Sequence, residues 1–298
     1  MSRPAPAAVL ELLKPITWFA PMWAFGCGLI SVAPSVAGDA SSWLMILAGV
    51  LLAGPLVCAT SQAANDWFDR HVDAINEPTR PIPSGRVPGR WGLYIALAWT
   101  VLSLLVAHTL GPWGFYAGVA GLVLAWIYSA PPLRLKQNGW WGNTAVAVCY
   151  EGVPWVTGAA IMAAGALPDA RILLLAALYS LGAHGIMTLN DFKSVDGDRR
   201  LGIGSLPVRL GVARAGRVAC LVMALAQAIV VALLFSWGRP WHGAAVLLLL
   251  LVQLGLMRRL LRSPRERAPW YNATGTSLYV LGMLCSALAV RRLQSPER

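Results

Sequence analysis

The acidic stretch NDWFDRHVD, residues 65–73, follows a long apolar segment. A second acidic stretch, NDFKSVDGD at residues 190–198, follows another apolar segment. Together with Glu77, the two stretches hold more than half of the 13 acidic residues in the chain. Carboxylates at a membrane boundary are costly to dehydrate, so a cluster of them there usually serves an ion or a substrate. Oxygen-rich side chains favour Mg²⁺, a hard cation that also bridges carboxylates to phosphates.

The composition is that of an integral membrane protein. Hydrophobic residues make up 57% of the chain and charged residues 12%, whereas a soluble domain carries about 25% charged residues. Apolar segments of about 20 residues can span a bilayer, and candidates lie at 16–37, 42–64, 91–110, 113–130, 141–165, 170–189, 213–237, 241–257 and 271–290. We therefore predict an all-α bundle of about nine transmembrane helices around one polar-mouthed cavity, forming a single domain over residues 1–298.

Basic residues are distributed unevenly between the predicted loops. If the N-terminus is cytoplasmic, 19 of the 24 Lys and Arg residues lie on its side of the membrane, two lie opposite, and three lie in the C-terminal tail. Cytoplasmic loops carry such an excess, so both acidic stretches are predicted to face the cytoplasm. Basic loops beside anionic lipid then explain the net charge of +11, and no nucleic-acid partner is expected.

Helical spacing indicates which acidic side chains share a cavity. At about 100° per residue, Asn65, Asp69 and Asp73 lie on one helix face. Asp191 and Asp198 also share a face, and Asp196 points away if the helix continues unbroken. Gly197 makes such a helix doubtful, so Asp196 stays among the candidates.

Basic side chains near the acidic stretches complete a site suited to phosphate. Arg and Lys neutralise phosphate oxygens, although contact with lipid headgroups is an equally good explanation for any one of them. The candidates are Arg80, Arg86, Arg134, Lys136, Lys193 and Arg199.

The pattern N-D-x-x-D-x-x-x-D, the second acidic stretch and the loop YSAPPLRLK at 128–136 resemble the UbiA superfamily of intramembrane prenyltransferases. The resemblance covers nearly the whole chain, and it implies a helical bundle in which Mg²⁺ holds a prenyl diphosphate. Ser194 stands where many members have the first acid of an Asp-x-x-x-Asp pattern, and Asp191 is expected to replace it. The implied catalytic residues are Asp69, Asp73 and Asp198, and the implied metal ligands are Asn65, Asp69, Asp73, Asp191, Asp196 and Asp198.

Longer matches, at 65–78, 80–86, 89–94 and 190–194, resemble the chlorophyll synthase branch of this superfamily and its bacteriochlorophyll-forming members. The implied reaction esterifies the propionate of bacteriochlorophyllide with geranylgeranyl or phytyl diphosphate. A carboxylate acceptor is already ionised near neutral pH, so no strong general base is required. The implied setting is a bacterial inner membrane, with the lipid bilayer and pigment-protein assembly factors as partners.

Three further residues are predicted to bind substrate: Tyr128, Glu151 and His184. Glu151 is an intramembrane carboxylate and hence a functional candidate by default, although a structural hydrogen bond explains it equally well. His184 could ligate the central Mg²⁺ of a pigment, or it could be a buried, hydrogen-bonded histidine. His71 is expected to face headgroups.

Two alternative functions remain open. The first is prenyl transfer to a quinone precursor or to haem. The second is a membrane transporter, because transporters also combine intramembrane carboxylates with weak internal repeats. Transporter acids tend to lie at mid-membrane, whereas these lie at the boundary beside basic loops.

Overall fold

The computed structural model describes residues 3–32 and 40–294, and this part of the chain is helical almost throughout. The long elements are α2 (Phe19–Ser31), α3 (Ala40–Leu51), α4 (Ala59–Asn76), α5 (Trp91–His108), α6 (Gly111–Ser129), α7 (Gly139–Ala147), α8 (Val153–Met162), α9 (Ala170–Asn190), α12 (Val212–Ser236), α13 (Pro240–Leu260) and α14 (Pro264–Gln294). Short elements precede or connect them: α1 (Pro6–Leu13), η1 (Pro15–Thr17), η2 (Leu52–Cys58), η3 (Leu135–Gln137), η4 (Val148–Gly152), η5 (Asp191–Lys193), α10 (Val195–Arg200) and α11 (Leu206–Leu210).

The helical architecture follows from the lipid environment. Backbone polar groups inside a bilayer must be satisfied within the segment, which selects helices. Seven helical segments of the described residues are long and apolar enough to cross a membrane: Ala40–Ile75, Trp91–His108, Gly139–Met162, Ala170–Lys193, Val212–Ser236, Pro240–Leu260 and Pro264–Arg291. The protein is thus a multi-pass, all-α membrane protein.

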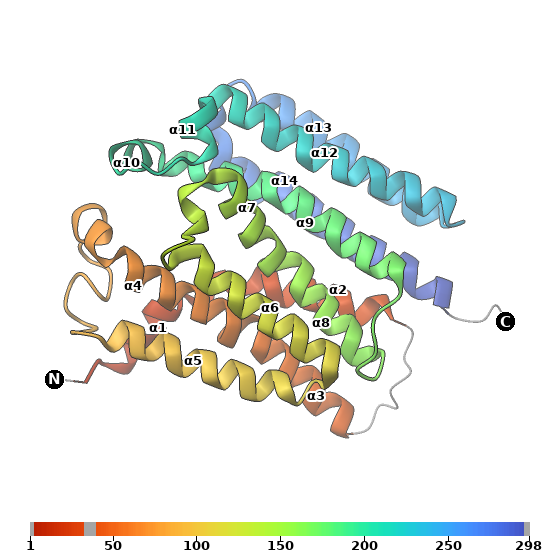
Figure 1. Ribbon diagram of the computed structural model, residues 1–298. Coiled ribbons are helices and arrows are strands. Elements are labelled where there is room, and N and C mark those ends of the chain that lie inside the picture. Colours follow the sequence, from red (N-terminus) through yellow and green to blue (C-terminus); the bar gives the residue numbers. More distant parts are fainter. Residues whose placement is uncertain (1–2, 33–39, 295–298) are drawn as a thin grey trace.

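The predicted number of about nine transmembrane helices is not confirmed by this criterion. α2 is apolar but has only 13 residues. α6 has 19 residues, but its glycines, tryptophans and tyrosines lower its mean hydropathy. Both helices nevertheless run within the bundle beside the longer ones (Figure 1).

Two wide turns interrupt the long segments. η2 contains Pro55, which lacks the N–H that an α-helix needs at that position, and the helix widens there to π geometry. η4 lies between α7 and α8 and carries Glu151. The segment that begins at Ala40 therefore continues as α4 through the first acidic stretch, beyond the predicted end at residue 64.

The elements that carry the two acidic stretches reach the same end of the bundle. The C-terminal part of α4 lies there together with α10 and α11, and the N-terminus is at this end, whereas the C-terminus is at the other (Figure 1). α9 packs against α7, α12 and α14, and α2 packs against α8 and α14. α6 packs against both α4 and α7, so α6 and α7 connect the helix of the first acidic stretch to α9, which leads into the second.

The contact between α2 and α8 depends on glycine. A Cβ atom added to Gly28 would lie 2.1 Å from the backbone oxygen of Trp155, and one added to Gly158 would lie 2.3 Å from the backbone oxygen of Phe25. Backbone atoms cannot move aside as a flexible side chain can, so these glycines permit the close approach of the two helices. By contrast, a Cβ atom added to Gly26 on the same helix meets nothing within 4 Å.

We expect Gly28→Ala to destabilise the protein by about 1–3 kcal/mol, the usual cost of overpacking a well-packed interior. The matched control is Gly26→Ala, which adds the same methyl group where there is room. Unfolding midpoints in one detergent measure both effects. Equal midpoints for the two variants would contradict the proposed close approach.

Candidate functional site

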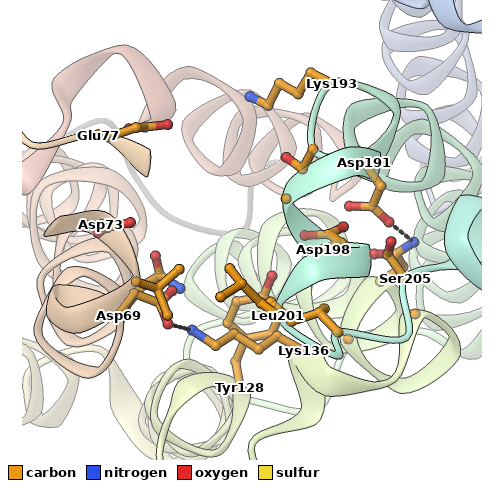
Figure 2. A pocket seen from close by; sticks show the side chains of 18 of the residues that line it. Asp69, Asp73, Glu77, Tyr128, Lys136, Asp191, Lys193, Asp198, Leu201 and Ser205 are labelled. Carbon is orange, nitrogen blue, oxygen red and sulfur yellow. Dashed lines mark hydrogen bonds and ion pairs between the residues drawn. The ribbon is translucent and has the colours of Figure 1, made fainter. Parts of the chain in front are cut away.

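A polar cavity of about 600 Å³ lies where the two acidic stretches meet. One wall is formed by α4 and the loop after it, and the other by η5 and α10 (Figure 2). The polar residues that line it are Asn65, Asp69, Asp73, Glu77, Arg80, Tyr128, Lys136, Asn143, Asp191, Lys193, Ser194, Asp198 and Ser205. The cavity therefore combines carboxylates from two distant parts of the sequence with basic groups.

The first wall comes from one face of α4. Asn65 donates from Nδ2 to the Ser129 hydroxyl at 3.1 Å, an orientation that leaves its side-chain oxygen available as a ligand. Asp69 accepts from Arg134 Nη2 at 3.2 Å and forms an ion pair with Lys136. The helical spacing of 65, 69 and 73 thus places three oxygen-bearing side chains along one side of the cavity.

Arg80 lies at the end of this wall and pairs with two of its carboxylates. Its guanidinium donates to Asp73 at 2.9 Å and also forms an ion pair with Glu77. Burial acts to lower the pKa of Arg80, but the carboxylates of Asp66, Asp73 and Glu77 outweigh it and raise the pKa. Arg80 is therefore a fixed positive charge at the edge of the cavity.

Asp66 has a different environment from its neighbours. It is only 1% exposed and accepts from Lys14 Nζ at 2.7 Å, with Arg80 3.4 Å away. It does not line the cavity. This carboxylate instead ties α4 to the segment between α1 and η1.

The second wall begins where α9 ends. The chain passes through η5 and then α10, and this break brings both Asp191 and Asp198 to the cavity. Asp191 accepts from Asn143 Nδ2 at 3.0 Å (Figure 2). Burial raises the pKa of Asp198, because desolvation disfavours the charged form of a carboxyl group.

Lys136 connects the base of the cavity to the first wall. Its side chain is 8% exposed and contacts Asp69 (Figure 2). Burial lowers the pKa of Lys136, although the charge of Asp69 opposes this effect. The ammonium group is thus held inside the cavity by a carboxylate rather than by water.

The loops before α7 and α11 are joined by backbone hydrogen bonds. Gly139 N donates to Gly204 O at 2.9 Å, and Gly204 N donates to Gln137 O at 3.0 Å. A Cβ atom on Gly139 would lie 2.4 Å from Leu206 N, so only glycine fits this contact. The loop with Lys136 and the loop after α10 therefore form one platform beneath the cavity.

Several residues predicted for the site lie outside the cavity. Asp196 is exposed and forms an ion pair with Arg265, because within α10 it lies two residues, or about 200°, from the cavity-lining Asp198. Arg86 is exposed and pairs with Glu11, and Arg199 is exposed on α10. Arg134 contacts Asp69 but does not line the cavity. The structure thus places Asp196, Arg86 and Arg199 outside the cavity that holds the other predicted residues.

The two intramembrane candidates line separate pockets. Glu151 lines a pocket of about 470 Å³ between α2, α9 and α14. His184 lines a more apolar pocket of about 640 Å³ beside α6 and α8, and it stacks on Trp140 with ring centroids 5.7 Å apart. Neither residue lines the acidic cavity, whereas Tyr128 does.

Asn143 is a cavity residue that the sequence analysis missed. It donates to both Asp191 and Thr188, at 3.0 and 3.2 Å. A polar amide within an apolar span was the available signal, since such residues usually have an intramembrane role. Its partner Asp191 lies 48 residues away, so this contact could not be predicted from local spacing.

The oxygen atoms of the two walls fit Mg²⁺. The described residues contain no group of three or more His, Cys, Asp or Glu side chains close enough to hold a metal ion by themselves. Mg²⁺ is typically bound through one or two carboxylates together with substrate phosphates and water. Asn65, Asp69 and Asp73 on one wall and Asp191 and Asp198 on the other provide such partial ligand sets.

Comparison with known proteins finds matches along nearly the whole chain. The model of the UbiA prenyltransferase family matches residues 16–286. A bacteriochlorophyll synthase 33 kDa chain from Cereibacter sphaeroides is 58% identical over 98% of this chain and 96% of that protein. A bacteriochlorophyll synthase 34 kDa chain from Chloroflexus aurantiacus is 44% identical over 94% of this chain and 89% of that protein.

A solved structure shares the fold. A UbiA homolog from Archaeoglobus fulgidus bound to DMAPP and Mg²⁺ has a TM-score of 0.71 and 18% sequence identity, covering 96% of this chain and 99% of that chain. At this identity the likeness concerns the fold alone.

We expect Asp198→Asn to weaken the binding of Mg²⁺ and inorganic diphosphate roughly tenfold or more, as the loss of a charged ligand predicts. The matched control is Asp196→Asn, two residues away, whose carboxylate points out of the cavity towards Arg265. Calorimetric titration of the purified protein with both probes together measures the effect. Equal losses of affinity in the two variants would show that the net charge of the protein, and not the position of Asp198 in the cavity, controls binding.

Proposed function

Because the chain belongs to the UbiA prenyltransferase family, we propose that it transfers a geranylgeranyl or phytyl group from its diphosphate to the propionate of bacteriochlorophyllide. The products are esterified bacteriochlorophyll and diphosphate. The observation that carries the proposal is the cavity with two oxygen-rich walls and interspersed basic groups, at one end of a membrane bundle. The names of the relatives support the choice of pigment.

Each group in the cavity has a role in this reaction. Arg80, Lys136 and Lys193 face the cavity and bind and orient a diphosphate. Mg²⁺, held by Asn65, Asp69, Asp73, Asp191 and Asp198, supplies positive charge that stabilises the diphosphate as it leaves. A UbiA homolog of the same fold is bound to DMAPP and Mg²⁺, which supports Mg²⁺ as the metal of the proposal.

The acceptor requires no strong base. Its propionate is ionised near neutral pH and needs only to be held against C1 of the prenyl group. Tyr128 forms part of the base of the cavity, where it limits the access of water to the reacting carbon. Prenylation of a quinone ring carbon also requires removal of a proton, whereas the described carboxylates of the cavity are assigned to the metal or, in the case of Glu77, paired with Arg80.

We also propose a single domain over residues 1–298 in a bacterial inner membrane, with the acidic cavity facing the cytoplasm and pigment-protein assembly factors as partners. The excess of basic residues in loops at the cavity end supports this orientation.

The acceptor is tested directly with purified protein, Mg²⁺ and geranylgeranyl diphosphate. We expect chromatography to show prenylated bacteriochlorophyllide and no product from hydroxybenzoate or haem. Chelation of Mg²⁺ with EDTA should abolish turnover, and added Mg²⁺ should restore it. Efficient prenylation of hydroxybenzoate with none of the pigment would overturn the assignment of the acceptor.

The orientation is tested by cysteine labelling in a background without Cys27, Cys58, Cys149, Cys220 and Cys285. Ser84→Cys, on the exposed loop after α4, should react with an impermeant maleimide only after the inner membrane is opened. Leu167→Cys, on the exposed loop between α8 and α9, should react in intact spheroplasts. The opposite pattern would place the cavity on the periplasmic side.

A further inference from the structure

An apolar groove of about 640 Å³ lies between α6 and α9, over α8, which runs between these two helices (Figure 1). Its floor consists of lining residues four positions apart on α7, η4 and α8: Thr144, Val148, Gly152 and Val156. None of the described residues lines both this α6–α9 groove and either the acidic cavity or the pocket that contains Glu151, the Glu151 pocket. The groove is therefore a separate space.

The groove is long and open to the bilayer. Tyr116 on α6 and Leu181 on α9 belong to its lining and are 59% and 47% exposed. Along α9 the lining extends from Leu173 to His184, a distance of about 16 Å along a helix. The volume of about 640 Å³ lies within the range of roughly 300–1,000 Å³ common for small-molecule sites. An extended apolar molecule can thus enter it from the lipid.

His184, at one end of the groove, has a fixed orientation. It is 5% exposed and stacks on Trp140, with ring centroids 5.7 Å apart. Its imidazole also forms a hydrogen bond with the backbone of Trp140. Because the N–H of Trp140 already donates to Asn138 Oδ1 at 3.0 Å, the imidazole donates this bond to the Trp140 carbonyl oxygen.

The other ring nitrogen of His184 has a free lone pair. The bond to Trp140 fixes the proton on the donating nitrogen, and no described group contacts the second nitrogen. His184 has no fully enclosed side-chain atom without a partner, so this nitrogen is accessible from the groove that His184 lines. An unpaired polar atom in apolar surroundings is unfavourable. Its position therefore indicates a ligand, and a neutral imidazole nitrogen is a common metal ligand.

The rest of the lining favours a neutral ligand. No Asp, Glu, Lys or Arg of the described residues lines the groove. The hydroxyl of Ser180, another lining residue, already donates to the Ala176 carbonyl oxygen. A pigment with a free propionate carboxylate would find no counter-charge here, which is costly in apolar surroundings. A pigment whose propionate is esterified carries no such charge.

We propose that the α6–α9 groove binds the esterified pigment, with the His184 imidazole as the axial ligand of the magnesium at the centre of its ring. This inference rests on the proposed function, because the esterified magnesium tetrapyrrole is the product of that reaction. The four ring nitrogens leave an axial position of the metal open, as in haem, where a histidine commonly fills it.

The shape of the groove fits the two parts of this ligand. The ring lies at the His184 end, and the prenyl tail runs past the small side chains of Ala177 and Ala120 towards Trp113. Because none of the described residues lines both the groove and the acidic cavity, pigment in the groove leaves the diphosphate site open for the next substrate. The groove is thus a holding site for finished pigment.

The test requires no turnover. Purified protein in detergent is titrated with ready-made bacteriochlorophyll and with its metal-free derivative. We expect His184→Phe, which keeps an aromatic ring against Trp140, to weaken the binding of bacteriochlorophyll roughly tenfold, the size of one good polar contact. Binding of the metal-free pigment should not change, because the losses from removing the imidazole and the metal report one contact and do not add. Equal binding of bacteriochlorophyll by wild type and His184→Phe would overturn the inference.

A second variant tests ligation itself. His184→Ala leaves room for a free imidazole molecule, whereas the ring in His184→Phe fills that room. Added imidazole should therefore restore the binding of bacteriochlorophyll in His184→Ala and not in His184→Phe. Restoration in neither variant, or in both, would overturn the role of His184 as the ligand.

The matched control is His108→Phe. His108 is an exposed histidine that stacks on Phe115, with ring centroids 6.0 Å apart, and it lines neither the groove, the acidic cavity nor the Glu151 pocket. This variant should bind bacteriochlorophyll as wild type does. A loss equal to that of His184→Phe would show that the effect is not specific to the groove, and would overturn the inference.

The position of the tail is tested by Ala177→Leu. Ala177 is an exposed lining residue, so a larger side chain there enters the groove without disturbing the helix packing. The variant should weaken the binding of bacteriochlorophyll and of its metal-free derivative alike, because both carry the tail. Unchanged binding of both pigments would contradict the path of the tail.

The outcomes separate this inference from the proposed function. Protein that binds bacteriochlorophyll through His184 but does not esterify bacteriochlorophyllide would overturn the proposed function and leave the site standing. Protein that esterifies bacteriochlorophyllide but binds the product equally well in wild type and His184→Phe would overturn the inference and leave the proposed function standing.

Discussion

Ion pairs make it possible to place carboxylates at the end of a membrane-spanning helix. Charges removed from water are tolerated when a counter-charge and hydrogen bonds replace the lost solvent. In α4, Asp69 is held by Arg134 and Lys136, Asp73 by Arg80, and Asp66 by Lys14. Arg80 and Lys136 line the cavity and also favour a diphosphate, so the ion pairs of Asp69 and Asp73 keep these anion-binding groups in position.

The sequence was most informative where a single helix carries the pattern. The spacing of Asn65, Asp69 and Asp73 predicted a shared face, and α4 runs unbroken through all three. The second stretch was harder because the chain changes direction at η5. Asp191 and Asp198 both line the cavity, on either side of this break, whereas Asp196, which was kept as a candidate because Gly197 made a continuous helix doubtful, does not.

The residues that the sequence misplaced have partners far along the chain. Arg86 pairs with Glu11, 75 residues away, and Asp196 pairs with Arg265, 69 residues away. Local spacing contains no information on such contacts, because they depend on how the helices pack. The same reason explains why Asn143, whose partner Asp191 is 48 residues away, was overlooked.

The acidic cavity and the Glu151 pocket have different surroundings. The acidic cavity is lined by charged side chains, whereas the Glu151 pocket is lined mostly by apolar ones, including the exposed Phe19 of α2 and Leu281 of α14. Under the proposed function, diphosphate leaves the acidic cavity into water, and the esterified pigment with its long apolar tail enters the bilayer. The two products thereby enter separate phases. Because they are diluted apart, the reverse reaction is disfavoured without any conformational change.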